Sequence, residues 1–509
     1  MTAVENETNT EATVPPGTPH PTTTPERPRS TSRARSRLIT DWDPEDTVAW
    51  EAGNKDIARR NLVWSVATEH IGFSIWSIWS VMVLFMPQAV YGFTPADKFF
   101  LVAVPTLVGA VLRVPYTMAT ATFGGRNWAV FSGIALLVPT TATWYLMVHP
   151  GHSYTTFLLV AGLAGLGGGN FASSMTNINA FYPQRMKGWA LGLNAGGGNI
   201  GVPVVQVVGL LVIASLGNRR PEIVCAVYLV LLAVVSIGAA MFMDNLDHQT
   251  ANAGAMKDVL GHADSWLISL LYIGTFGSFI GFSFAFGQVL QITFLAGLTS
   301  GAPTAAQSAA ASLHAAQIAF IGPLLGSVSR VLGGRLADRR GGGLITLVTF
   351  VSMVVAGGIL VASGTADDAT KGAATGLQLT GLIAGFILLF ILSGIGNGSV
   401  YKMIPAIFER KSLALRGVGA EQRQQWSRAM SGALIGIAGA IGALGGVGIN
   451  LLLRTSYAGS AKSATAAFWV FTAFYVVAAL VTWVRFVRRP KVESVSAATV
   501  PDLQTQTTT

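Results

Sequence analysis

Charge is what this sequence has least of. Only 11% of its 509 residues are charged, whereas an ordinary soluble domain has about 25%. Hydrophobic residues make up 51%, and they fall in runs of about 20, the length that a helix needs to cross the roughly 30 Å hydrocarbon layer of a bilayer. A soluble fold of this size is therefore excluded, and we expect a multi-pass protein embedded in the lipid bilayer.

Cysteine and metal-binding patterns are also scarce. The single cysteine, Cys225, lies in an apolar run and excludes both intrachain disulfides and cysteine-based metal sites. The seven histidines are scattered, with no pair at metal-ligand spacing, and no phosphate-binding glycine loop precedes a lysine. No acid, base and nucleophile converge within the helices. We therefore expect no metal, no cofactor and no catalytic residue, and the protein is not predicted to be an enzyme.

The first residues lack the basic start and apolar run of a cleavable signal peptide. Residues 1–40 are rich in Thr, Pro, Ser and Arg and nearly free of large apolar side chains, so they cannot bury enough surface to offset ordering entropy. We predict that residues 1–61 form a largely disordered cytoplasmic tail. The net charge is +9, but the basic residues gather at helix ends, and no nucleic-acid partner is expected.

Apolar runs predict twelve membrane-spanning helices. Most Lys and Arg residues fall in the loops that lie inside when both termini are cytoplasmic, and the positive-inside rule supports that orientation. The predicted spans are 62–90, 97–121, 127–148, 154–181, 187–215, 222–243, 264–297, 308–337, 343–363, 374–407, 429–453 and 464–487.

Two short motifs occur twice. Gly109-Ala-Val-Leu-Arg113 returns as Gly326-Ser-Val-Ser-Arg330, and Gly169-Asn170, with Phe181 twelve residues after the glycine, returns as Gly396-Asn397 with Phe408. The chain thus reads as two related six-helix halves, the architecture of the major facilitator superfamily. We predict an all-α membrane protein with twelve transmembrane helices in two pseudo-symmetric six-helix bundles, 62–243 and 264–487, with a cytoplasmic linker at 244–263 and a cytoplasmic tail at 488–509.

Glycine is abundant, with 58 residues, and it concentrates at 165–169, 196–198 and 436–446. Small residues let helix backbones approach closely where lipid supplies no hydrophobic driving force. They also let helices slide between two conformations. Both interpretations remain open.

Arg113 and Arg330 lie inside apolar runs, where a guanidinium costs at least a few kcal/mol. Pairing with a buried carboxylate or snorkelling to the membrane surface would account for them, but neither helix holds an internal Asp or Glu. Equivalent positions in the two halves would bring both cations to one depth, facing a central cavity. The flat donor fork of arginine matches a small planar oxyanion, and this pattern predicts an anion site.

Aromatic and amide side chains occur at compatible depths. The aromatic ones are Phe73, Phe171, Tyr272 and Phe276, each of which could equally serve packing; the amides are Asn170, Asn177, Asn194 and Asn199.

Four stretches carry a family resemblance: Gly167 to Met175, Gly188 to Gly201, Tyr272 to Phe282 and the glycine-rich run from Gly432 to Gly446. They closely resemble the nitrate/nitrite porter family of the major facilitator superfamily, and the resemblance covers roughly residues 60–487. It implies that Arg113 and Arg330 clamp the anion and that aromatic rings sandwich its plane. The implied rings are Phe73, Phe171 and Phe276, with Asn199 contacting the anion and Tyr272 donating a further hydrogen bond.

Several ionisable residues are candidates for coupling or gating. The stretch from Gly333 to Arg340 resembles the superfamily's cytoplasmic loop motif, in which Arg335 and Asp338 would act near a helix end as the inner gate opens. Glu69 and Lys402 lie on helices that would line the cavity. Glu69 could take up a proton, or it could merely pair with Lys402 or His70.

The resemblance therefore implies secondary active transport of nitrate and nitrite by alternating access across the bacterial cytoplasmic membrane, in the service of nitrate assimilation. Exchange of nitrate for nitrite is favoured, with proton-coupled nitrate symport as the alternative, and we expect a monomer. An anion channel and a nitrate sensor are competing classes. Saturable flux with counter-transport would exclude the channel, and the lack of a flanking signalling domain disfavours the sensor.

Overall fold

The computed structural model describes residues 37–247, 253–299, 301–364, 374–460 and 462–488. Within these ranges eleven helical spans are long and apolar enough to cross a membrane. They are α5 (Pro95–Phe123), α6 and α7 (Gly125–Ala135, Leu137–Val148), α8 and α9 (Tyr154–Ala164, Leu166–Phe181), α10 and α11 (Gln184–Asn199, Gly201–Leu216), α12 (Glu222–Phe242), α14, η4 and α15 (Ala263–Tyr272, Ile273–Gly277, Ser278–Leu298), α16 and α17 (Ala305–Ala319, Ile321–Arg340), α18 (Gly342–Ser363), α19 (Gly376–Leu413), α20 (Ala420–Ala458), and α21 with η6 (Thr465–Thr482, Trp483–Arg488).

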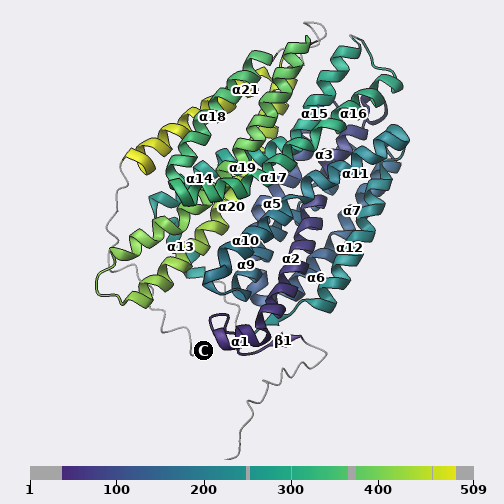
Figure 1. The fold of residues 1–509 in the computed structure, drawn as a ribbon. Coiled ribbons are helices and arrows are strands. Elements are labelled where there is room, and N and C mark those ends of the chain that lie inside the picture. Colours follow the sequence, from purple (N-terminus) through teal and green to yellow (C-terminus); the bar gives the residue numbers. More distant parts are fainter. Residues whose placement is uncertain (1–36, 248–252, 300, 365–373, 461, 489–509) are drawn as a thin grey trace, which may run out of the picture. The chain divides into compact units, whose positions relative to one another are not determined.

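The predicted first span is helical too. It consists of α2 (Lys55–Trp76), α3 (Ile78–Met82) and the 3-10 turn η2 (Val83–Phe85), with a kink at Ser77. The α2 helix carries charge through its first half, at Lys55, Asp56, Arg59, Arg60 and, further on, Glu69. With this helix the chain forms the twelve-helix, two-bundle fold expected from the sequence, the two halves lying side by side in Figure 1.

Proline explains where three of the spans are broken. A proline lacks an amide hydrogen, and its ring clashes with the carbonyl four residues earlier. Pro139, Pro203 and Pro323 place those carbonyls on the last residues of α6, α10 and α16. The predicted helices at 127–148, 187–215 and 308–337 are therefore each two segments, and the break after α10 falls at Asn199.

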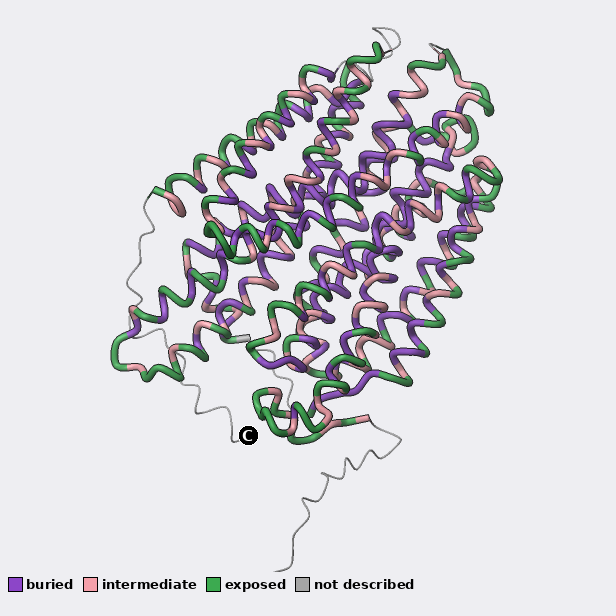
Figure 2. The backbone as a smooth tube through the Cα atoms, viewed as in Figure 1, coloured by how far each residue is buried: buried purple, intermediate pink, exposed green. Residues whose placement is uncertain are grey.

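Burial follows the membrane environment. Figure 2 shows buried residues along the middle of the bundle and exposed ones on its outer faces. Many of the exposed side chains are apolar, such as Val111, Leu159, Val230 and Val355, which suits a surface that meets lipid. The same interior holds Arg113, Arg330 and Glu69.

The segment before the first span is structured, which corrects the predicted tail for its last part. Strand β1 (Leu38–Ile39) pairs in parallel with β2 (Asn245–Leu246) in the linker, and α1 (Thr47–Ala49) and η1 (Trp50–Asn54) lead into α2. Trp42 and Trp50 pack edge-on against Phe181 and Tyr182. We call residues 38–54 the strap. The end of the bundle that the strap covers is called the strand end. The strap's two tryptophans anchor it to the bundle, and residues 1–36 lie outside the described part.

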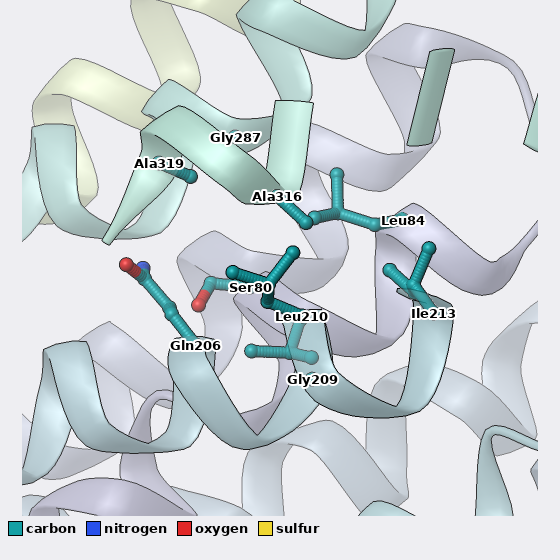
Figure 3. A pocket seen from close by; sticks show the side chains of 10 residues that line it. Ser80, Leu84, Gln206, Gly209, Leu210, Ile213, Gly287, Ala316 and Ala319 are labelled. Atoms are coloured by element: carbon teal, nitrogen blue, oxygen red, sulfur yellow. The ribbon is translucent and has the colours of Figure 1, made fainter. Parts of the chain in front are cut away.

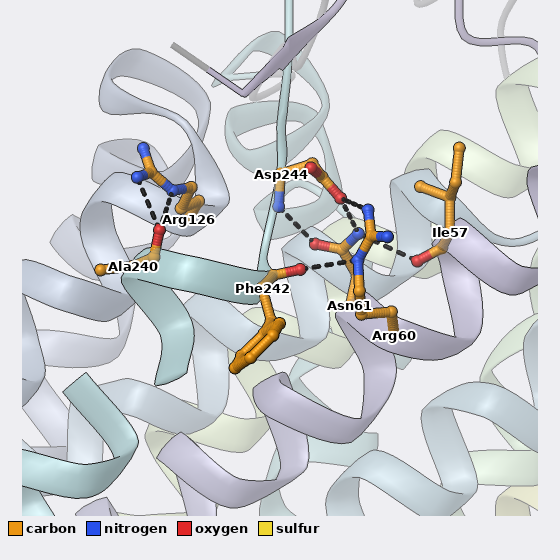
Figure 4. A network of polar contacts seen from close by, with 7 residues as sticks. All are labelled: Ile57, Arg60, Asn61, Arg126, Ala240, Phe242 and Asp244. Carbon is orange, nitrogen blue, oxygen red and sulfur yellow. Dashed lines mark hydrogen bonds and ion pairs between the residues drawn. The ribbon is translucent and has the colours of Figure 1, made fainter. Parts of the chain in front are cut away.

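Polar contacts hold the strand end together (Figure 4). Asp244, just after α12, accepts hydrogen bonds from Arg60 Nη2 (2.6 Å) and Asn61 Nδ2 (2.9 Å) of α2. Arg126 at the start of α6 donates to the Ala240 carbonyl. The linker thus begins with residues fixed to the first helix.

The rest of the linker is not simply a polar loop. A short helix, α13 (Ala253–Leu260), packs against α20, with Ala255 and Val259 buried. α20 itself begins at Ala420, nine residues before the predicted start at 429. The division into two bundles with tails at 1–61 and 488–509 stays a prediction, and residues 489–509 lie outside the described part.

Candidate functional site

Two buried arginines, one from each half, define the centre of the molecule. Arg113 lies on α5 and is 1% exposed, and Arg330 lies on α17 and is 9% exposed. In the part of the chain that the structure describes, neither forms an ion pair with a carboxylate. Pairing with buried acids or reaching the membrane surface therefore does not account for these two cations in this structure.

Arg113 bridges the two halves. Its Nη1 donates a 2.8 Å hydrogen bond to the carbonyl of Gly439 on α20. Its guanidinium carbon lies over the rings of Phe171 (4.6 Å from the centroid) and Phe276 (4.9 Å). Nε and Nη2 are buried and have no protein partner, so two donors of the fork stay available to an acceptor.

Arg330 is held mainly by rings. Its guanidinium carbon is 5.1 Å from the centroid of Tyr401 on α19, and its Nη2 makes a long 3.4 Å hydrogen bond to the Tyr272 hydroxyl. The second terminal nitrogen, Nη1, is buried without a partner.

A column of four aromatic rings connects the surroundings of the two arginines. Phe171 and Phe276 are 6.4 Å apart, Phe276 stacks on Tyr272 at 5.1 Å, and Tyr272 stacks on Tyr401 at 4.6 Å. Tyr272 lies directly before η4 and Phe276 lies within it. η4 is a π-helical stretch, and such stretches recur at functional sites. The structure thus brings together Phe171, Phe276, Tyr272 and both arginines.

Phe73 lies one layer behind this column. It packs on Phe171 (6.0 Å) and on Trp76 (5.1 Å), and among the described residues it has no ring contact with either arginine. The sequence reasoning missed Trp76 and Tyr401, which both face a guanidinium. Trp76 follows Phe73 by one helical turn, and Tyr401 follows the repeated Gly-Asn motif, so helical spacing from either could have indicated them.

Asn199 is an unusual buried amide. It is 1% exposed, and neither its oxygen nor its nitrogen has a protein partner. It is the last residue of α10, at the break imposed by Pro203. Asn194 leaves only its amide oxygen unpartnered, since its Nδ2 donates to Glu69 and Ser174. Asn199, by contrast, is a buried amide with both polar atoms unused.

These groups suit a small anion. Buried polar groups in proteins are nearly always satisfied, and leaving one unpaired costs about 1–3 kcal/mol. Three guanidinium nitrogens present donors without acceptors beside flat ring faces, and the Asn199 amide is a further buried donor without a partner. A planar oxyanion would accept from these donors and offset the charge of the arginines.

Glu69 is a separate buried acid, fully enclosed on α2. Its Oε2 accepts hydrogen bonds from Ser174 Oγ and from Asn194 Nδ2 (2.6 Å), while Oε1 has no partner. His70 Nδ1 lies 3.0 Å from the Gly197 carbonyl. Lys402 pairs with Asp338 instead, so the suggestion that Glu69 pairs with Lys402 or His70 is wrong.

The predicted gating residues lie toward the strand end. Lys402 Nζ of α19 is 2.9 Å from Asp338 Oδ1 of α17, and both side chains are about half exposed. Arg335 is exposed one turn before Asp338. The structure brings Lys402 and Asp338 together, and neither of them makes an ion pair with the two arginines among the described residues.

Contacts between the halves continue from the arginines toward the end opposite the strand end. Phe99 stacks on Tyr457 at 5.1 Å, and Gln288 Nε2 donates to the Pro95 carbonyl. Gln291 Nε2 and Ser312 Oγ both donate to the Leu84 carbonyl. These contacts close the seam between the halves on that side.

A small cavity lies on this seam rather than at the arginines. Figure 3 shows its lining from α3, α11, α15 and α16, including Ser80, Gln206, Gly287 and Ala316. It has room for about one water molecule. Gln206 spans the seam, since its Nε2 donates to the Ser283 carbonyl, and the cavity is too small for an anion-binding site.

Comparisons with known proteins agree with this arrangement. The family model described as Major Facilitator Superfamily matches residues 65–419. The chain is 34% identical to the nitrate/nitrite transporter NarU of Salmonella typhimurium over 470 residues, covering 89% of this chain and 96% of that protein. It is 34% identical to NarU of Escherichia coli over 476 residues, with the same coverage.

A more distant relative is the probable nitrate/nitrite antiporter NarK2 of Thermus thermophilus, which is 31% identical over 74% of this chain and 84% of that protein. Among solved structures, the partially occluded inward-open form of the xylose transporter XylE from E. coli matches with a TM-score of 0.59 at 13% identity, covering 85% of this chain and 100% of that chain. At this identity the likeness concerns the fold alone.

Proposed function

This chain belongs to the major facilitator superfamily, and on that premise we propose that it carries nitrate and nitrite across the membrane by alternating access, exchanging one anion for the other. It is a multi-pass membrane protein. We propose the bacterial cytoplasmic membrane as its location, with both termini in the cytoplasm, a monomeric state and a role in nitrate assimilation. Its relatives named as nitrate/nitrite transporters and antiporters support the choice of substrates.

One observation carries the proposal: two buried arginines from opposite halves have donors without acceptors and lie against aromatic faces. Nitrate is flat, permanently charged and surrounded by acceptor oxygens, so it matches two planar donor forks. Sugars and cationic drugs do not need two unneutralised cations. The assigned roles are Arg113 and Arg330 as the clamp, with Phe171, Phe276 and Phe73 as ring faces and Asn199 and Tyr272 as donors.

Exchange follows from the charge of the empty site. Enclosing unneutralised arginines in a low-dielectric interior is costly, and a bound anion offsets part of that cost. A carrier without anion is therefore expected to change conformation slowly, while one with nitrate or nitrite does so readily. Net movement then requires an anion in each direction.

Glu69 supports a second candidate, proton-coupled nitrate symport. Its carboxyl is buried, forms no ion pair with a cationic side chain among the described residues, and leaves Oε1 without a partner. A carboxyl in such surroundings is a reasonable carrier of one proton. In that case Lys402, Asp338 and Arg335 would act only on the gate.

The test is uptake of labelled nitrate into proteoliposomes. Vesicles loaded with nitrite should take up nitrate rapidly, whereas vesicles loaded with sulfate, or lacking protein, should take up little whatever the pH gradient. Uptake should saturate with nitrate and be stimulated by internal nitrate, which a channel would not show. Strong acid-driven uptake into sulfate-loaded vesicles would favour the symporter, and no nitrate movement under any condition would contradict the proposal.

A further inference from the structure

Tyr401 touches the surroundings of both arginines, and nothing in the preceding assignment uses it. It lies on α19, four residues after Asn397 and directly before Lys402. Its ring lies against the guanidinium of Arg330 on one side and stacks on Tyr272, with an interplanar angle of 16°.

The Tyr401 ring constrains the side chain of Arg330 more strongly than the hydrogen bond from Arg330 to Tyr272 does. In the part of the chain that the structure describes, the guanidinium of Arg330 makes one hydrogen bond, to the Tyr272 hydroxyl, which is 3.4 Å long and therefore weak. A guanidinium lying over an aromatic face in a desolvated site gains appreciably from the ring. The plane of the Tyr401 ring thus sets where the Arg330 fork points.

The hydroxyl of Tyr401 reaches the position where Arg113 crosses between the halves. A methyl group built on Gly439 would lie 3.3 Å from the Tyr401 hydroxyl oxygen and 3.2 Å from Arg113 Nη1. The same Gly439 accepts the hydrogen bond of Arg113, and the Tyr401 hydroxyl is 3.5 Å from the Ile435 carbonyl one turn earlier on α20. The ring therefore lies against one arginine, and the hydroxyl lies beside the backbone that holds the other.

We propose that Tyr401 is a positioning residue that fixes the spacing of the Arg113 and Arg330 donor forks and thereby sets the preference for nitrate over nitrite. The inference rests on the proposed function. Nitrate has three oxygens in one plane and can satisfy donors of both forks at once, whereas nitrite has two and depends less on their spacing. Displacing one fork should therefore weaken nitrate binding more than nitrite binding.

Replacing the ring by an aliphatic side chain tests this directly. In purified protein, Tyr401→Leu and Tyr401→Met should each raise the nitrate Kd about tenfold, from loss of a buried cation–π contact, and the nitrite Kd by a smaller factor. Tyr401→Phe keeps the ring and should stay within about threefold of wild type for both anions. Tyr475→Phe is the matched control, because Tyr475 is a buried tyrosine whose hydroxyl bonds Ser278 on α15, away from the arginines.

Titration calorimetry with nitrate and with nitrite gives two Kd values for each variant, one for each anion, and thermal unfolding shows whether a variant is folded. Using two aliphatic variants guards against one that fails to fold. A ring-specific loss of the nitrate preference, restored in Tyr401→Phe, is the expected result. Unchanged Kd ratios in a folded Leu or Met variant would overturn the role of Tyr401. Wild-type protein that binds neither anion would instead overturn the proposed function, and this inference with it.

Discussion

The two arginines are held in different ways, although they occupy equivalent motifs. Arg113 is anchored by a 2.8 Å bond to the Gly439 carbonyl, whereas Arg330 depends on the rings of Tyr401 and Tyr272. Each leaves part of its planar fork unused. The property that matters at this scale is therefore the geometry of the fork as well as its charge.

Lysine at either position keeps the charge and removes the fork. We expect Arg113→Lys and Arg330→Lys each to reduce nitrate uptake to nearly nothing, because losing one charge-assisted pair in a desolvated site costs roughly 2–5 kcal/mol. Arg219→Lys, an exposed change in the turn η3 (Gly217–Arg219), outside the proposed binding and gating residues, should transport normally.

The measurement is nitrate uptake into nitrite-loaded proteoliposomes, at matched protein content and with thermal unfolding as the check on folding. Near-normal uptake by both lysine variants would contradict the proposal that Arg113 and Arg330 clamp the anion.

At the residue scale, what could be predicted depended on how rare each signal is. A guanidinium inside an apolar run is costly and therefore conspicuous, so Arg113 and Arg330 were found from the sequence alone. A tyrosine in such a run is ordinary, and the position of Tyr401 under Arg330 arises only when α17 and α19 pack together. The partners of Glu69 were missed for the same reason, since Ser174 and Asn194 lie on two other helices.

Helix packing around the site depends on glycines that face backbone. A methyl group on Gly277 would lie 2.7 Å from the Gly445 Cα atom and 2.9 Å from the Gly442 carbonyl oxygen. Neither is the movable end of a side chain. By contrast, a methyl group on Gly436 would meet nothing within 4 Å. The dense glycines of α20 therefore include some that permit close packing and some with free space beside them.

Gly277→Ala should accordingly destabilise the protein by about 1–3 kcal/mol through overpacking, while Gly436→Ala should be neutral or slightly stabilising, since alanine favours helix. Thermal unfolding of the two purified variants beside wild type measures the difference. Equal melting temperatures for the two would show that the η4 and α20 backbones separate easily.

Element boundaries were predicted well where apolar runs end sharply and poorly where helices continue into water. The starts of α5 and α12 agree with the sequence within two residues, but α2 and α20 begin earlier because polar first turns lie outside the bilayer. The strap was missed because its strand has only two residues and its partner lies far along the chain. By contrast, the breaks after α6, α10 and α16 could have been predicted from the positions of the prolines in the sequence.

For the whole molecule, the choice between nitrate–nitrite exchange and proton-coupled symport depends on the carboxyl of Glu69. Under exchange, Glu69→Gln should change the rate of nitrate–nitrite exchange while leaving uptake into sulfate-loaded vesicles low at every pH gradient. The reason is that the amide keeps most of the contacts with Ser174 and Asn194 but cannot carry a proton.

The assay compares acid-driven and nitrite-driven uptake in wild type and Glu69→Gln. Acid-driven uptake that is strong in wild type and lost in the variant would establish the symporter and refute obligatory exchange.

The pairing of β1 with β2 has a consequence for the order of events during synthesis. About 200 residues separate the two strands, and a ribosome adding roughly 5–20 residues per second needs on the order of 10–40 s to make them. Until then Leu38 and Ile39 lack their backbone partners. Trp42 and Trp50 likewise lack their ring contacts until Phe181 and Tyr182 have been made. The strap can therefore pair fully only after all six helices of the first half have been synthesised.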